Sequence, residues 1–74
     1  MEEAEVHAIL REIADDVGRE SPLHAAVIHG RLLTEGRPVP LRDVGRSVGR
    51  SGERARQVQI LAMEQITERM REAV

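Results

Sequence analysis

The chain has 74 residues, a net charge of −2, no cysteine and no aromatic residue. This length supports one small domain that buries about 60% of its unfolded surface, and the absence of cysteine excludes disulfides, thiolate catalysis and cysteine zinc sites. Without aromatic side chains there is no base-stacking platform for single-stranded nucleic acid, and no apolar run reaches the roughly 20 residues of a membrane span, so we expect a cytoplasmic protein without a membrane partner.

The first predicted helix lies within residues 1–20 and ends near Gly18. Its apolar residues recur with the spacing of one helical face. They are Val6, Ile9, Leu10, Ile13 and Val17. A second helix begins at Ser21 and Pro22, an N-cap followed by a first-turn proline. It runs to Leu33, with Leu23, Ala26, Val27 and Leu33 as its inward residues.

Gly36, Pro38 and Pro40 end the second helix and form a loop. A third helix is predicted over residues 41–48 and a long fourth helix over residues 52–70. The pattern therefore predicts an all-α protein, a small helical domain of about four helices.

The connection between the last two helices reads VGRSVGRSG, residues 44–52. A phosphate loop needs a glycine, four residues and then Gly-Lys-Ser/Thr, but the chain contains no lysine. A helix corner fits instead: Gly45 permits close approach, Gly49 supplies a left-handed residue, and Ser51 caps the fourth helix. The pattern predicts a helix-turn-helix, whose second helix enters the major groove of DNA.

Charge is distributed unevenly along the chain. Residues 31–56 carry seven arginines and three acidic residues, whereas residues 1–30 carry seven acidic residues and two arginines. This asymmetry indicates an anion-binding middle segment, although a solvated arginine-rich surface accounts for it equally well.

The titratable residues do not indicate an enzyme. The three histidines lack i, i+4 spacing and a companion cluster, so we expect no metal site and no cofactor. Adjacent carboxylates diverge on a helix, so a catalytic pair is not expected either.

The segment LRDVGRSVGRSGERARQVQ resembles the DNA-binding region four of housekeeping-type bacterial sigma factors. The resemblance covers about residues 22–67 and is carried by the Glu-Arg-x-Arg-Gln string behind a glycine corner. It implies that residues 21–74 form a region-four-like domain, whereas residues 1–20 resemble no family. It also implies binding to double-stranded promoter DNA, with RNA polymerase or another transcription protein as partner.

By position in the family, Glu53 and Gln57 face base edges, and Arg54 and Arg56 hold phosphates or a base. Glutamate can accept from cytosine N4, glutamine can pair with adenine, and arginine suits guanine or phosphate. The alternative for these residues is a solvated polar helix face. The complete candidate DNA-binding set is Arg42, Arg50, Ser51, Glu53, Arg54, Arg56 and Gln57.

The chain also departs from the family pattern. Gly52 replaces a base-reading arginine, Arg50 replaces the apolar residue that plugs the turn, and Pro40 replaces a threonine cap. Ile60 and Leu61 stand where basic residues are expected, so phosphate contacts are lost there.

The fourth helix is apolar on two sides. One stripe, expected to pack on the corner, contains Val58, Ala62, Ile66 and Met70. The other is turned away and contains Ile60, Met63, Met70 and Val74. This second stripe is expected to be covered either by the first helix, folded back, or by a second copy of the chain or a foreign protein. The candidate partner interface is Ile60, Met63 and Val74.

Three functions remain compatible with the sequence. The first, which we favour, is a DNA-binding transcription factor, as a homodimer or with a protein partner. The second is a protein interaction module that keeps the helix-turn-helix but has exchanged DNA for a protein. The third is a winged-helix-like fragment of a larger enzyme or repressor.

Overall fold

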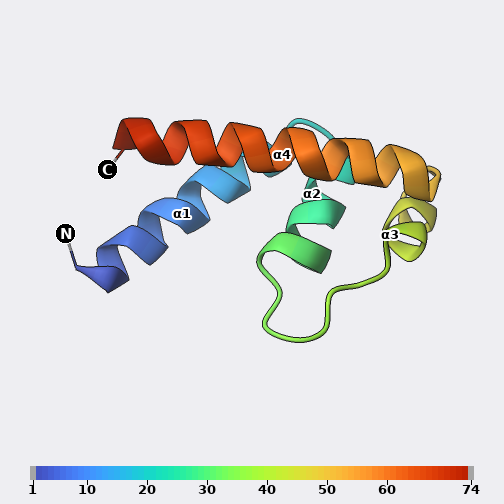
Figure 1. Cartoon of the computed structure of the whole chain (residues 1–74), viewed down its shortest axis with the longest axis horizontal. Helices are drawn as coiled ribbons and strands as arrows, with labels where there is room; N and C mark the ends of the chain where they lie inside the picture. Colours follow the sequence, from blue (N-terminus) through green and yellow to red (C-terminus); the bar gives the residue numbers. More distant parts are fainter. Residues whose placement is uncertain (1, 74) are drawn as a thin grey trace.

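The computed structural model describes residues 2–73, which form only helices and loops. The elements are α1 (Glu3–Gly18), α2 (Pro22–Val27), the π-helical segment η1 (Ile28–Leu32), α3 (Leu41–Ser47) and α4 (Gly52–Ala73). Helix α4 runs along the long dimension of the molecule, and α1, α2 and α3 all contact it (Figure 1). The predicted all-α class is therefore confirmed.

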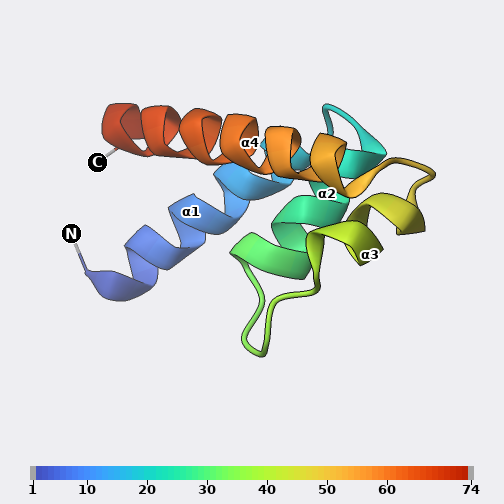
Figure 2. The same cartoon turned by 45° about the vertical axis from the view of Figure 1, so that its right-hand side comes forward.

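Helix α1 has acidic residues at its start and ends at the predicted glycine. Glu3 and Glu5 lie in the first turn, where carboxylates favour the positive end of the helix dipole. Only the second half of α1 is deeply buried, through Ile13, Ala14 and Val17. Its N-terminal half diverges from α4 in both views (Figures 1 and 2).

Helix α2 has the predicted cap, but the segment after it differs from the prediction. The Ser21 Oγ accepts from the His24 amide at 3.1 Å, and Pro22 follows the cap. From Ile28 the helix becomes π-helical, with the Leu33 amide donating to the Ile28 carbonyl at 2.8 Å. The Gly30 carbonyl meanwhile accepts from Val39 at 3.0 Å. That bond to the following loop diverts a carbonyl from the regular α-helical pattern.

Helices α3 and α4 are joined by a four-residue turn that has the predicted chemistry. Gly49 adopts a φ of 72°, the left-handed conformation that suits glycine. The Ser51 Oγ accepts from the Arg54 amide at 3.0 Å and so caps α4. Figure 2 shows α3 beneath the first turns of α4, and the loop after η1 extends away from both helices.

The core consists of two apolar clusters that share α4. The first joins α1, η1 and the middle of α4 through Ile13, Ala14, Val17, Ile28, Ala62 and Ile66. The second joins α2, α3 and the start of α4 through Leu23, Val27, Val44, Ala55 and Val58. The α2–η1 segment lies between the clusters, so it is buried on two faces.

This packing corrects the predicted assignment of the α4 stripe. Val58 does pack on the corner, but Ala62 and Ile66 pack against α1. Helix α1 therefore covers the stripe that was expected on the corner, and Ile60 and Met63 remain exposed. None of the helices within residues 2–73 combines the length and the apolar character needed to cross a membrane.

Candidate nucleic-acid interface

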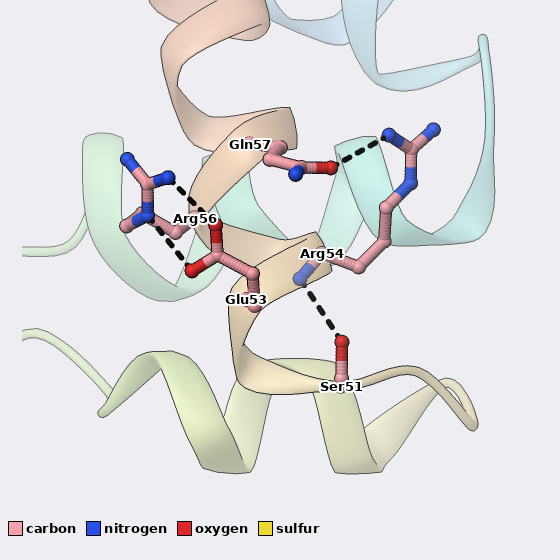
Figure 3. A network of polar contacts seen from close by, with 5 residues as sticks. All are labelled: Ser51, Glu53, Arg54, Arg56 and Gln57. Atoms are coloured by element: carbon pink, nitrogen blue, oxygen red, sulfur yellow. Dashed lines mark hydrogen bonds and ion pairs between the residues drawn. The ribbon is translucent and has the colours of Figure 1, made fainter.

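Five of the candidate DNA-binding residues lie together at the start of α4 (Figure 3). Ser51 is the cap, and Glu53, Arg54, Arg56 and Gln57 are all exposed. The helix places them on its outer surface because Ala55 and Val58, between and after them, are buried against α2 and α3. The buried pair fixes the rotation of α4, and hence the direction of the polar side chains.

Glu53 and Arg56 form a two-point ion pair on one side of the helix. The Arg56 Nε donates to Glu53 Oε2 at 3.0 Å, and its second nitrogen donates to Oε1 at 2.6 Å. The hydrogen bond from Arg56 holds the pKa of the Glu53 carboxyl below its usual range, and the same bond raises the pKa of Arg56. Without a ligand, the Arg56 charge is therefore already matched.

Arg54 projects from the opposite flank of α4. Two residues along a helix correspond to a rotation of about 200°, so Arg54 and Arg56 diverge by about 160° around the axis. Figure 3 shows this divergence, with Glu53 between the two arginines. Within the described part of the chain, the Arg54 guanidinium makes only one contact, a 3.3 Å hydrogen bond to the Gln57 Oε1. Its charge is available to a ligand.

Arg42 and Arg50 border the same surface from α3 and from the turn. The Arg42 side chain is 78% exposed and reaches Asp43 only at 3.9 Å. A Cβ atom at Gly52 would lie 3.1 Å from the Arg42 Cα, tighter than ordinary van der Waals contact. The close approach of α3 thus gives a physical reason for the small residue directly after Ser51.

Ser21 lies beside Arg50 and Arg54 and contacts His24, and neither Ser21 nor His24 is among the predicted functional residues. Ser21 lines a pocket of about 270 Å³ together with Arg50 and Arg54, and its Oγ lies 2.8 Å from the His24 Nδ1. His24 is 7% exposed. The Ser-x-x-His spacing occupies the two side-chain positions of a capping box, although the histidine ring contacts the serine hydroxyl and not its backbone amide. That signal could have predicted the serine–histidine contact, but not the pocket.

The candidate partner interface is only partly described. Ile60 and Met63 are 44% and 49% exposed, and Leu61 is 45% exposed on another side of α4. Val74 lies outside the described residues. Within residues 2–73, no three histidine, aspartate or glutamate side chains lie close enough to hold a metal ion.

Comparison of the chain with protein families, with curated proteins and with solved structures found no match.

Proposed function

We propose that this protein binds double-stranded DNA as a transcription factor, with the start of α4 in the major groove. The observation that carries the proposal is the outward set of Glu53, Arg54, Arg56 and Gln57, held at the corner by the buried residues beneath it. B-DNA has a major groove about 12 Å wide, which admits one α-helix.

This set has the chemistry to read bases at its centre and phosphates at its sides. Glu53 and Gln57 offer an acceptor for cytosine N4 and a two-point partner for adenine. Arg54 and Arg56 point to opposite flanks, as arginines must to reach the phosphates that border the groove on each side. Alanine at Glu53 or Gln57 should therefore relax the preference at one base position, by about 1–3 kcal/mol.

The charge of the whole chain supports the same orientation. The arginine-rich segment, residues 31–56, includes α3 and the start of α4 at one end of the molecule, whereas the acidic helix α1 extends toward the other end (Figure 1). DNA approaching the basic end keeps its phosphates away from the acidic helix.

The proposed DNA binding carries an energetic cost at the Glu53–Arg56 ion pair. Arg56 must leave Glu53, or share its donors with it, before it can hold a phosphate. A single domain with a net charge of −2 should bind DNA weakly. Weak binding favours additional contacts from RNA polymerase, another transcription protein or a second copy of the chain.

Salt dependence tests the proposal. The logarithm of duplex affinity should fall linearly with the logarithm of salt concentration, and Arg54→Gln should reduce the slope by about 0.9. Arg56→Gln should reduce it less, because Glu53 already neutralises that arginine. Arg71→Gln, at an exposed arginine near the far end of α4, is the matched control. Equal slopes in the wild type and the Arg54 variant would place Arg54 outside the interface.

A second candidate function is a protein interaction module. The observation in its favour is the exposure of Ile60 and Met63 on α4 in the isolated chain. Such a module would form a stable complex that is indifferent to DNA. One measurement of duplex binding at several salt concentrations distinguishes the two functions. A transcription factor requires salt-sensitive binding to the duplex, whereas an interaction module requires no DNA binding.

A further inference from the structure

The pocket between α2 and the start of α4 is suited to a small anion. Ser21, Arg50 and Arg54 border it, and Leu23 and Val58 contribute apolar walls. Within residues 2–73 neither arginine forms an ion pair with a carboxylate, in contrast to Arg56. Two uncompensated guanidinium groups beside one cavity favour an anion there, and arginine geometry matches phosphate oxygens.

The Ser21 hydroxyl can assist this anion in only one hydrogen-bonding arrangement. A serine hydroxyl has one donor and two acceptor positions. One acceptor position is taken by the His24 amide at 3.1 Å. The His24 Nδ1 at 2.8 Å takes either the remaining acceptor position or the hydroxyl proton. Ser21 can therefore donate to an anion only when the Nδ1 carries a proton and donates to Ser21.

The other ring nitrogen of His24 makes that arrangement depend on charge. The His24 side chain is 9% exposed, and its Nε2 lies 3.6 Å from Glu20 Oε2. Among the described residues this buried Nε2 has no hydrogen-bond partner. A neutral ring with its proton on Nδ1 would turn a lone pair toward the carboxylate. A neutral ring with its proton on Nε2 avoids this conflict but takes the Ser21 proton. Only the doubly protonated ring faces Glu20 with a donor and also leaves Ser21 free to donate.

The carboxylate beside the ring also favours its doubly protonated form. The charged group beside the His24 ring is Glu20 on the α1–α2 turn, whereas Arg50 and Arg54 line the pocket next to Ser21, its hydrogen-bond partner. From α4, Gln65 approaches Glu20 at 3.0 Å without carrying a charge.

We propose that the pocket binds a phosphate-like tetrahedral oxyanion and that binding takes up one proton at His24. The proton comes from solvent. It completes a chain in which Glu20 accepts from Nε2, Ser21 accepts from Nδ1, and the Ser21 hydroxyl donates to the anion. A phosphodiester of a DNA backbone and a free phosphate share this chemistry. Only the DNA source rests on the function proposed above.

Sulfate is the probe for the pocket, because it does not change charge over the range in which histidine titrates, about pH 5–8. At constant ionic strength, sulfate titrations followed by amide chemical shifts should give binding about fivefold tighter at about pH 5.5 than at about pH 7.5, since one linked proton allows at most tenfold per pH unit. Nitrogen-15 spectra of the ring should show Nε2 protonated in the free protein and both nitrogens protonated with sulfate.

Variants distinguish anion binding in the pocket from proton uptake at His24. His24→Gln should remove the pH dependence, whereas His29→Gln, at an exposed histidine, should keep it. Arg54→Gln should weaken sulfate binding at both pH values with an unchanged ratio, and Arg37→Gln, at an exposed arginine in the loop, should leave binding as in the wild type. Circular dichroism checks folding. If His24→Gln does not fold, Ser21→Gly serves instead, because glycine is tolerated at an N-cap, and it should also remove the pH dependence.

Each result decides between the possibilities. A wild-type sulfate affinity that is the same at both pH values overturns the proton coupling. Sulfate binding that Arg54→Gln leaves unchanged overturns the site. A duplex of about 20 base pairs provides the second arm, since its phosphodiesters do not titrate in this range. Pocket binding of sulfate without binding of the duplex would support a free phosphate as the ligand and would refute the DNA-binding function alone.

Discussion

Replacement of Gly45 by alanine should open the corner between α3 and α4. A Cβ at Gly45 would collide with the Ser51 carbonyl oxygen and would lie 2.8 Å from the Arg50 carbonyl oxygen. Both are backbone atoms that cannot rotate away. The Gly45 carbonyl also accepts from the Arg50 amide at 2.8 Å, so a shift of the turn weakens this bond as well.

Two opposing effects set the size of the change. Overpacking against backbone costs about 1–3 kcal/mol, and alanine regains about 1 kcal/mol of helix propensity over glycine. Because the clash involves two carbonyl groups, we place the steric cost in the upper part of that range. The expected net loss is about 1–2 kcal/mol. For a domain of this size, that corresponds to a fall in Tm of about 4–16 °C.

Thermal unfolding, followed by circular dichroism, compares the Tm of the Gly45 variant with that of variants at two other glycines. Gly36→Ala is the matched control, because a Cβ there meets no atom of residues 2–73 within 4 Å, and it should change stability by less than about 0.5 kcal/mol. Gly49→Ala is also free of clashes, but it forces alanine to a φ of 72°, which costs about 1 kcal/mol. If the Gly45 variant melted as high as the Gly36 variant, the close approach at the corner would be refuted.

The ion pair between α1 and α4 predicts a pH effect: the Arg69 guanidinium donates to Asp16 Oδ2 at 2.5 Å and holds the pKa of that carboxyl below its usual range. A depressed pKa means that the stabilisation is present above about pH 4 and is lost as the pH falls through the folded-state value. Carboxyl chemical shifts should therefore give Asp16 a titration midpoint below that of an ordinary aspartate, and Arg69→Gln should raise this midpoint; an equal midpoint in that variant would exclude the pair in solution. The exposed face of α4 predicts a dimer or a stable heteromeric complex, which Ile60→Glu together with Met63→Glu should disrupt without loss of helical circular dichroism. A wild type that sediments as a monomer at high concentration and captures no partner would contradict this.

Local signals in the sequence predicted the helices and the corner. Ser21 with Pro22, Gly49 and Ser51 each act within one turn of chain, through a cap bond or a permitted φ, so their effects do not depend on distant residues. The inward rotation of Ala55 and Val58 followed from helical spacing in the same way. These residues also fixed which polar side chains of α4 face outward.

Tertiary contacts decided which surfaces meet and which charges stay free. Ile28 is completely buried because α2–η1 lies between two clusters, and the spacing of a single helix face could not anticipate a second partner. The stripe with Ala62 and Ile66 could have met either the corner or α1, because apolar surface is not specific for its partner. Ser21 and Arg54 are 33 positions apart in the sequence. Only the crossing of α2 over α4 places them at one pocket, because side chains so distant along the chain meet through packing alone.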